Sequence, residues 1–259
     1  MSQAGKLSDV NSNSTLIIVP TYNESENLPV LIDLIEKHAP DCHLLIVDDN
    51  SPDGTADLAD SLFAGRQGAS VLRRTGPRGL GLSYVDGYRH ALTRGYARVV
   101  QMDADLSHDP RYIPDLTQAS VNADVVIGSR YCPGGGVTGW PMNRLLLSMF
   151  ANVYVAAITG LRVRDATAGF RCYTRRALEG IDIERIRSNG YAFQVEMVYR
   201  ASRSGLSIAE VPIVFTDRAR GKSKISRKVL LESMVVPWRL RFGSRQPKEF
   251  DTLSTPVRK

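Results

Sequence analysis

The sequence predicts an α/β fold in which a mostly parallel central sheet carries helices on both faces. Short runs of aliphatic and β-branched residues, such as Leu16–Val19 and Leu44–Val47, alternate with segments whose apolar residues recur at helical spacing. These short runs are apolar at every position, which is typical of strands that are buried on both faces. Polar segments rich in Asp and Asn directly follow three of the runs, and ligands of such sheets bind beyond the strand ends.

The first half of the chain alternates regularly between the two kinds of segment. Pro20 ends the first strand, and the apolar residues from Leu28 to Ile35 then recur at helical spacing, with Pro29 tolerated in the first turn of the helix. The elements that follow are a strand at 44–47, a helix around 58–63, a short strand at 71–72, a helix at 83–94, a strand at 99–102, a helix near 112–121 and a strand at 124–128.

The second half is less regular. We expect a loop rich in Gly and Pro at 132–141, an apolar helix at 144–158, a strand near 169–173, a helix near 192–204, a strand at 207–215, a basic loop at 217–226 and a final helix to about residue 242. The sequence contains no evident repeat or linker. We therefore predict a single domain over 15–243, between a disordered N-terminus at 1–14 and a flexible tail at 244–259.

Composition excludes several classes of protein. With 43% hydrophobic and 23% charged residues, the chain suits a folded domain and not a disordered one. Its three cysteines are scattered, so we expect neither a disulfide framework nor a Cys-based metal site, and a reducing cytosol suits them. Met1–Ser14 lacks the apolar core of a signal peptide. The longest uncharged stretch, Leu145–Leu161, falls short of the roughly 20 apolar residues that span a bilayer.

The net charge of +6 conceals an asymmetry along the chain. From Asp217 to Lys259 there are 12 basic and 4 acidic residues, which leaves 21 basic and 23 acidic residues in the first 216. A basic segment of this kind favours phosphates, nucleic acid or an anionic membrane surface. A solvated basic tail is the alternative interpretation.

A pair of carboxylates follows the strand at 99–102. Asp103 and Asp105 lie where the chain turns, so both side chains can converge on one cation, or on a cation and a ribose. Divalent cations such as Mg²⁺ or Mn²⁺ prefer oxygen ligands. An acidic turn without a ligand is the alternative, because such turns are common after strands. Asp109, which precedes Pro110, is expected to cap the next helix.

Two further polar segments end strands on the same predicted edge. Pro20–Glu24 follows the first strand and Val47–Gly54 the second, and both also fit simple turn and capping chemistry. The first strand is not followed by GxGxxG, which argues against a dinucleotide fold, and no P-loop motif occurs. Gly76–Gly81 fits either a flexible loop or a phosphate-binding loop.

Taken together, the motifs resemble those of the family 2 glycosyltransferases with a GT-A fold, and among them the polyprenol-phosphate (dolichol-phosphate) mannose synthases. The segments that carry the resemblance are Val19–Glu24, Val47–Thr55, Gly79–Gly81, Asp103–Pro110, Gly128–Arg130, Asp165–Arg171 and Arg218–Lys224. Their order and spacing over nearly the whole predicted fold are far more specific than any one motif.

The resemblance implies a role for individual residues. It implies a nucleotide-sugar site formed by Pro20, Tyr22, Glu24, Val47, Asp48, Asp49, Asp103, Ala104, Asp105, Arg130 and Lys224. It implies acceptor-phosphate contacts from Arg130, Arg144, Ser148 and Arg218, and metal ligands in Asp103, Asp105 and Ser107, the last replacing a Gln that is frequent in the family. Asp105, Arg130 and Arg218 would carry catalysis. A family lysine is replaced here by Ala192.

The implied reaction transfers mannose with inversion from GDP-mannose to a polyprenyl monophosphate, with Mg²⁺ or Mn²⁺ as cofactor. An ordinary inverting transfer to a hydroxyl group needs a general base, whereas a phosphate acceptor is already anionic and needs its charge screened instead. Arginine suits this task because its planar fork donates two hydrogen bonds to phosphate oxygens. A site rich in arginine without a Ser/His/Asp triad agrees with such a reaction.

A lipid acceptor also implies contact with a membrane. The apolar helix at 144–158 fits either a core helix or an interfacial one, and Met234–Phe242 combines apolar residues, Trp238 and arginines in an interfacial pattern. We expect a peripheral protein at the cytoplasmic face of the membrane, bound there directly or recruited by a separate membrane-anchoring subunit, and no binding of nucleic acid.

Two other functions remain open from the sequence. One is a polyprenyl-phosphate glucosyltransferase, or another family 2 enzyme with a different nucleotide sugar. The other is a non-catalytic basic module that binds membranes or RNA, against which the acidic motifs at the predicted ligand edge argue, because they would repel nucleic acid.

Overall fold

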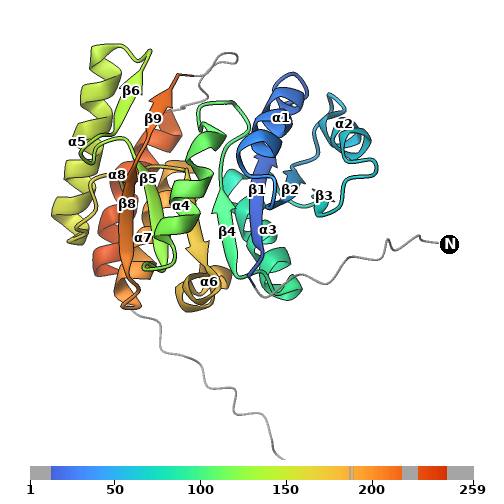
Figure 1. Ribbon diagram of the computed structural model, residues 1–259. Coiled ribbons are helices and arrows are strands. Elements are labelled where there is room, and N and C mark those ends of the chain that lie inside the picture. The colour runs from blue at the N-terminus through green and yellow to red at the C-terminus, as the bar shows by residue number, and fades with distance from the viewer. Residues whose placement is uncertain (1–12, 187, 189, 218–226, 244–259) are drawn as a thin grey trace, which may run out of the picture.

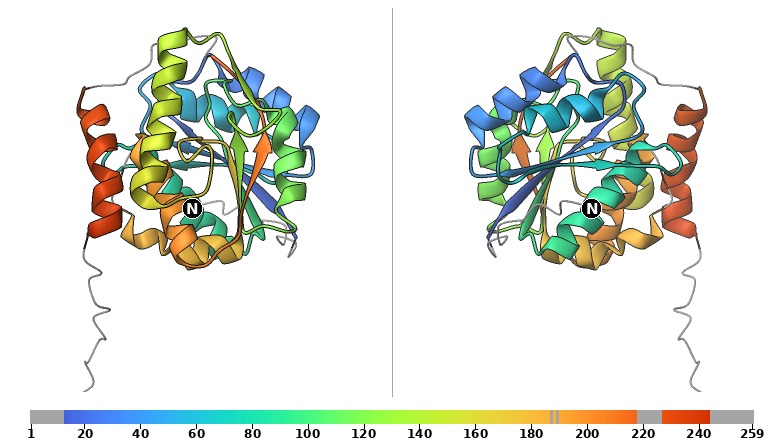
Figure 2. Two further views of the ribbon diagram at one scale, coloured as in Figure 1. Left: turned by 90° about the vertical axis from the view of Figure 1, so that its left-hand side faces the viewer. Right: turned by 90° about the vertical axis from the view of Figure 1, so that its right-hand side faces the viewer.

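The computed structural model describes residues 13–186, 188, 190–217 and 227–243, with the side chains of the last helix described from Met234 onward. Within these residues, one sheet has seven strands in the order β3-β2-β1-β4-β7-β5-β8, and β6 and β9 form a second, two-stranded sheet. Helices cover both faces of the large sheet (Figures 1 and 2). The predicted fold class is therefore confirmed. The predicted terminal segments lie outside the described residues, apart from Asn13 and Ser14.

The strands of the large sheet are β1 (Thr15–Thr21), β2 (His43–Asp48), β3 (Ala69–Arg73), β4 (Arg98–Gln101), β5 (Val125–Ser129), β7 (Arg171–Thr174) and β8 (Ile208–Pro212). The small sheet consists of β6 (Gly136–Thr138) and β9 (Val214–Thr216). The helices are α1 (Leu28–His38), α2 (Thr55–Leu62), α3 (Leu80–Arg94), α4 (Ile113–Ala119), α5 (Met142–Thr159), α6 (Arg175–Ile181), α7 (Gly190–Arg203) and α8 (Arg227–Phe242), with 3₁₀ turns η1 (Pro110–Tyr112) and η2 (Ile183–Arg185).

Successive residues of a strand point to opposite faces of the large sheet, and helices bury both faces. In β1, Leu16 and Ile18 belong to one hydrophobic cluster with residues of α3, α6 and α7. Ile17 and Val19 belong to a second cluster with residues of α1, α2 and α4. This arrangement explains why the strand segments of the sequence are apolar at every position.

The topology brings the polar motifs to one edge of the large sheet. β1, β2, β3 and β4 are parallel neighbours, β5 and β8 are parallel to each other, and β7 runs antiparallel between β4 and β5. Arg171, the first residue of β7, pairs with Gln101 at the end of β4 and with Ile127 near the end of β5. The residues before Arg171 therefore lie at the edge where the parallel strands end.

Several element boundaries differ from the predictions. The expected loop at 132–141 contains β6, and the expected strand at 207–215 divides into β8 and β9, which belong to different sheets. The division follows Pro212, which has no N–H group to continue the strand ladder. Helix α6 was not predicted, and the helix expected at 112–121 is the η1 turn followed by the shorter α4.

Two expectations about helix starts are confirmed. Pro29 lies in the first turn of α1. The Asp109 side chain accepts a hydrogen bond of 3.0 Å from the backbone N–H of Arg111 and so caps η1.

We predict that Gly87→Val destabilises the protein because α3 lies in direct contact with β1 at this residue. A Cβ atom on Gly87 would lie 2.7 Å from Cγ2 of Ile18, closer than side-chain atoms pack. We expect a loss of about 1–3 kcal/mol in the free energy of unfolding, measured by urea denaturation. Gly76→Ala is the control, because a Cβ atom there meets no atom within 4 Å. Equal stability of both variants and the parent would contradict the close approach.

Candidate active site

The carboxylate pair lies in a tight turn after β4. The backbone N–H of Asp103 donates to Nδ1 of His108 at 3.0 Å, and Asp103 Oδ1 accepts a hydrogen bond of 2.9 Å from the hydroxyl of Tyr84. Asp105 Oδ1 accepts from both the N–H and the hydroxyl of Ser107, at 3.1 and 2.5 Å. Both carboxylates are therefore held by neighbouring groups. Ser107 orients Asp105, and its role as a metal ligand remains a prediction.

The turn itself is defined by its backbone and by what packs beneath it. Leu106 has a φ of 64°, a left-handed conformation that folds the chain back between the two aspartates and His108. The imidazole of His108 stacks on Phe170, with ring centres 5.1 Å apart. At Gly169, a Cβ atom would lie 3.2 Å from His108 and 3.5 Å from Oδ2 of Asp103. The segment before β7 therefore packs directly against the turn that holds the carboxylate pair.

Tyr84 provides this site with a permanent hydrogen-bond donor. Its side chain lies fully inside the core, on α3. Burial and the nearby charge of Asp103 raise the pKa of Tyr84 well above its usual value, because both disfavour a phenolate. The hydroxyl therefore stays protonated and continues to donate to Asp103.

The two aspartates after β2 are engaged within the protein. Asp48 accepts hydrogen bonds from the hydroxyl of Thr21 at the end of β1 and from the N–H and hydroxyl of Ser51. Asp49 forms an ion pair with the buried Arg74 and accepts a hydrogen bond of 2.8 Å from the N–H of Gly79. Both carboxylates thus connect loops, as the turn-and-capping interpretation expects, and their contact with a nucleoside remains a prediction.

The loops after β1 and β2 are also tied to each other. The backbone N–H of Glu24 donates to the hydroxyl of Thr55 at 3.0 Å. Arg78 donates to the hydroxyl of Tyr22 at 2.6 Å, and its guanidinium carbon lies 4.4 Å from the centre of the Tyr22 ring. The Gly76–Gly81 loop therefore reaches the residues predicted to bind the nucleoside, through Arg78 and through Gly79.

Arg130, at the end of β5, forms a buried ion pair with Asp165. Its Nε and Nη2 lie 2.7 and 2.6 Å from the two carboxylate oxygens, and Nη2 also donates to Thr167 at 2.8 Å. The exposed fractions of the two side chains are only 5% and 0%. Burial opposes ionisation of Asp165, but the hydrogen bonds and charge of Arg130 outweigh it and lower the pKa of Asp165 below its usual value.

Arg144, in the first turn of α5, forms a second and more accessible pair. Its Nη1 lies 3.0 and 3.1 Å from the two carboxylate oxygens of Asp217, and its guanidinium carbon lies 4.1 Å from the ring centre of Trp140. One turn further along α5, Ser148 accepts a hydrogen bond of 2.7 Å from the hydroxyl of Tyr131. The prediction that Arg144 and Ser148 share one face of a helix is consistent with these contacts.

Trp140 connects the two arginines. The guanidinium carbon of Arg130 lies 5.5 Å from its ring centre, against 4.1 Å for Arg144. Such cation–π contacts hold both positive charges near one aromatic side chain. The cluster lies at the edge where β5 and β8 end, which is also the edge of the carboxylate pair.

The described residues fit a divalent cation only with help from a ligand. Asp103 and Asp105 supply hard carboxylate oxygens, but within the described part of the chain no group of three or more His, Cys, Asp or Glu side chains gathers for a metal ion. A cation held by two carboxylates needs further oxygens, and a bound diphosphate commonly supplies them. The donor set therefore fits a metal that binds together with a nucleotide.

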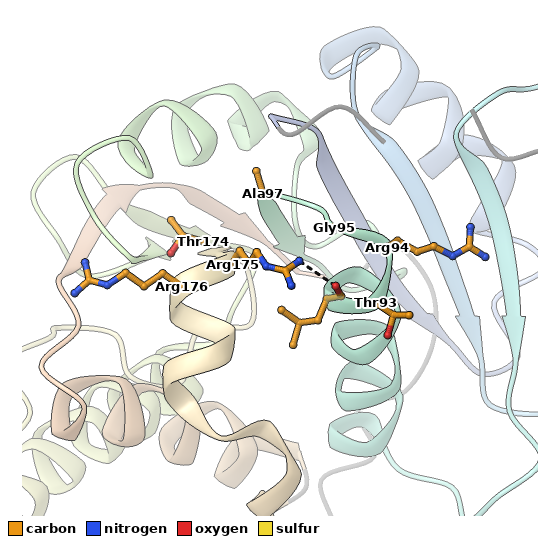
Figure 3. A pocket seen from close by; sticks show the side chains of 8 residues that line it. Thr93, Arg94, Gly95, Ala97, Thr174, Arg175 and Arg176 are labelled. Atoms are coloured by element: carbon orange, nitrogen blue, oxygen red, sulfur yellow. Dashed lines mark hydrogen bonds between the residues drawn. The ribbon is translucent and has the colours of Figure 1, made fainter. Parts of the chain in front are cut away.

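A solvent-open hollow of about 620 Å³ lies at the opposite edge of the sheet, where β4 begins and β7 ends. Figure 3 shows that Arg94 and Arg176 point away from each other there. Arg175 donates to the backbone oxygen of Leu92 at 2.9 Å. Because these basic groups do not converge, we assign no ligand to the hollow.

The structure therefore gathers most of the predicted site residues. The two that lie outside the described residues are Arg218 and Lys224. Pro20, Val47 and Ala104 are buried, and the side chains of Val47 and Ala104 lie in the core, so a ligand would meet only their backbone. The partners that sequence reasoning did not assign to the site are Tyr84, Tyr131, Trp140, Asp165, Thr167 and Asp217. Of these, Asp165 and Thr167 lie in the Asp165–Arg171 segment, which is one of the motifs that carry the family resemblance.

We predict that Asp165→Asn strongly destabilises the protein, because it leaves the charge of Arg130 buried without a partner. The expected loss is about 3–5 kcal/mol in the free energy of unfolding at pH 7. Asp109→Asn is the control, because its pair with Arg111 is exposed and such pairs contribute less than about 1 kcal/mol.

We predict that the contribution of the Arg130–Asp165 ion pair to the free energy of unfolding depends on pH. The pKa of Asp165 is lower in the folded than in the unfolded protein, so its ion pair stabilises the parent above about pH 4 and this contribution disappears as the pH falls through the folded-state value. Urea denaturation at several pH values should show the parent and Asp165→Asn converging at low pH. A constant difference would contradict the assignment.

Solved structures support the fold. Glucosyl-3-phosphoglycerate synthase from Mycobacterium tuberculosis, solved in complex with Mn²⁺, UDP and glucosyl-3-phosphoglycerate, superposes with a TM-score of 0.65 over 91% of this chain and 82% of that one. The sequence identity is 18%, so the likeness concerns the fold alone. The fold is that of the GT-A glycosyltransferases.

Sequence comparisons identify the family. Residues 16–182 match the model of glycosyl transferase family 2. A polyprenol monophosphomannose synthase from Mycolicibacterium smegmatis is 46% identical over 231 residues, which cover 88% of this chain and 87% of that protein. An undecaprenyl-phosphate mannosyltransferase from Micrococcus luteus is 45% identical over 220 residues, which cover 85% and 90%. This chain is accordingly a member of glycosyl transferase family 2.

Proposed function

We propose that the protein transfers mannose from GDP-mannose to the phosphate of a polyprenyl monophosphate, with inversion at the anomeric carbon. The observation that carries the proposal is the position of Arg144. It lies at the same sheet edge as Asp103 and Asp105, on a helix whose outer face is apolar. A phosphate group can thus meet a cation while its lipid chain leaves along an apolar surface.

The relatives support the acceptor and the sugar. Both curated proteins are named as mannosyltransferases that act on polyprenyl phosphates, and the alignments cover nearly the full length of each chain. The donor is a nucleotide sugar, and we propose GDP-mannose. UDP-glucose is the competing donor to be tested.

The reaction needs little proton transfer from the protein. At neutral pH a phosphate monoester is already largely ionised, so its oxygen can attack the anomeric carbon without a general base. The new bond joins that carbon to the lipid phosphate, while the bond to the diphosphate oxygen breaks and GDP leaves with the electron pair. The task of the protein is to position two anions and screen their repulsion.

The arginines at the edge provide that screening. Arg144 and Ser148 contact the acceptor phosphate in this proposal. Arg130 would contact a ligand through Nη1, because its Nε and Nη2 bind Asp165. Arg218 and Lys224 would add positive charge.

Asp103 and Asp105 would hold Mg²⁺ or Mn²⁺ with the donor diphosphate. When bound, such an ion neutralises charge that develops on the leaving diphosphate. The protein's own contribution is to hold both carboxylates in position, through Tyr84, Ser107 and the turn at Leu106.

The apolar faces of α5 and α8 form the proposed membrane surface. The two helices lie side by side in both views of Figure 2, and α5 is long and apolar enough to cross a bilayer by length and composition alone. Its inner face, however, packs on the protein body through Asn152, Val155 and Thr159. The large apolar side chains that remain exposed are Met142, Leu146, Leu147, Met149, Phe150, Val153, Met234, Val235, Trp238 and Phe242.

An aromatic seam joins these two helices. The Phe150 ring stacks on Tyr154, the hydroxyl of Tyr154 accepts a hydrogen bond of 2.9 Å from Trp238, and the Trp238 ring stacks on Phe242. Aromatic side chains with one polar group are typical of the membrane interface. We therefore propose that α5 and α8 lie in the plane of the interface. A separate membrane-anchoring subunit is the other partner that this face would suit.

The direct test is a transfer assay with purified protein, a polyprenyl monophosphate in detergent, Mg²⁺, and either GDP-mannose or UDP-glucose labelled in the sugar. The expected product is a mannosyl lipid in the β configuration, formed only from GDP-mannose. Transfer from UDP-glucose alone would replace the proposed donor. An absence of lipid-linked sugar from either donor would contradict the function.

We predict that Asp105→Asn weakens Mn²⁺ binding in the presence of GDP by at least tenfold, because the variant keeps the shape of the side chain and removes its charge. Calorimetric titration with Mn²⁺ measures this without turnover. Asp57→Asn is the control, since it removes an exposed carboxylate on α2. Full activity of the parent after removal of metals with EDTA would contradict metal dependence.

We predict that Arg144→Ala raises the KM for polyprenyl phosphate at least tenfold and leaves the Kd of GDP-mannose nearly unchanged. Arg144 contacts Asp217 and Trp140, and none of its recorded contacts is with the loops predicted to bind the nucleoside. Steady-state kinetics and calorimetry measure the two constants. A comparable loss of donor affinity would show that the two sites are not separate.

We predict that Phe150→Ser weakens binding to vesicles that contain anionic lipid, because the Phe150 side chain is 66% exposed on the proposed membrane surface. Co-sedimentation measures the bound fraction. Val30→Ser is the matched control, since Val30 is 49% exposed on α1. Equal binding of both variants would exclude this face as the membrane contact.

A further inference from the structure

The two arginine–carboxylate pairs beside Trp140 differ in accessibility. The side chains of Arg130 and Asp165 are buried, with exposed fractions of 5% and 0%. Arg144 and Asp217 are 27% and 34% exposed, so a solute can reach both partners. Only the second pair can exchange one anion for another without unfolding its surroundings.

The position of Asp217 does not depend on Arg144. Its backbone N–H donates to the carbonyl of Thr138 at 3.0 Å, directly after the pairing of β6 with β9. Gly139 has a φ of 83°, and a Cβ atom there would lie 3.2 Å from Cβ of Asp217. Glycine therefore allows the two segments to approach each other closely. The backbone therefore places a carboxylate against Arg144.

Trp140 supplies a second indication that an anion belongs here. Its ring lies beneath the guanidinium of Arg144, and its Nε1 is buried without a hydrogen-bond partner among the described residues. A buried N–H group without an acceptor is costly, and an oxyanion that reached Nε1 on displacing Asp217 would relieve that cost. Asp217 holds Arg144 but leaves this donor unsatisfied.

We propose that Asp217 is an internal competitor of the acceptor phosphate: its carboxylate occupies Arg144 in the empty protein, and the phosphate of the substrate displaces it. This inference rests on the proposed function, since it assigns Arg144 to the acceptor. Asp217 thereby lowers the affinity for phosphate, because its negative charge competes for the arginine and repels the incoming anion.

The competition also sets specificity. A phosphate brings its own charge and two or more oxygens, so it can replace a carboxylate that is bound through both oxygens. A neutral hydroxyl compound or water cannot offer the arginine an equivalent partner. Asp217 therefore disfavours acceptors that lack an anionic group, at the cost of weaker binding to those that have one.

The test is a binding measurement without donor or metal. Inorganic phosphate and geranyl monophosphate are titrated by calorimetry into the parent, Asp217→Asn, Arg144→Gln and the double variant. Exposed ion pairs contribute up to about fivefold in an equilibrium constant, so Asp217→Asn should bind both ligands about two- to fivefold more tightly. In the Arg144→Gln background, the same change at Asp217 should have no effect.

Each outcome separates the alternatives. If Asp217→Asn binds phosphate as weakly as the parent, more weakly, or not detectably, Asp217 orients Arg144 and does not compete with the ligand. If binding also tightens in the Arg144→Gln background, or in the control Asp57→Asn, the effect is one of net charge and the proposal is wrong. Transfer of mannose by the parent together with either result would leave the proposed function intact and reject only the competition.

Discussion

The buried ion pair between Arg130 and Asp165 is the constraint on which the site depends. Asp165 stands at the start of the segment that leads into β7, and four residues later Gly169 packs against Asp103. One short stretch of chain thus contacts both Arg130 and the carboxylate pair and fixes the distance between them. Because β7 is the antiparallel strand, this stretch begins at the edge where the parallel strands end. Loss of the pair would disturb both halves of the site together.

In the proposed function, helix α5 connects the phosphate-binding site with the surface that would contact the lipid. Its inner face carries Arg144, Ser148 and Asn152, and its outer face carries exposed apolar side chains. An amphiphilic acceptor has the same division, with a charged head and a hydrocarbon chain. A single helix with two faces therefore suits such a ligand better than a closed pocket, and no enclosed cavity is required for the lipid. The aromatic seam extends this surface onto α8.

Much of this arrangement could be predicted from the sequence, because parallel strands bring their carboxyl ends together. The residues after β1, β2 and β4 were placed at one edge for that reason. The direction of β7 could not be predicted, since a buried strand has the same apolar pattern in either direction. The three-residue strands β6 and β9 are too short to show an alternating apolar pattern. The contact of Asp217 with Arg144, which follows from their pairing, could therefore not be predicted. The sequence left open whether Asp48 and Asp49 serve turn and capping chemistry, and their hydrogen bonds show that both connect loops.

In the proposed mechanism, the carboxylate pair and Arg144 hold two phosphate groups side by side at one sheet edge. Anomalous scattering from crystals soaked with Mn²⁺, GDP and geranyl monophosphate measures this most directly. A manganese peak is expected beside Asp103 and Asp105, with the geranyl phosphate on Arg144 and its chain directed along α5. Manganese elsewhere, or the phosphate in the basic hollow at the opposite edge, would contradict the claim.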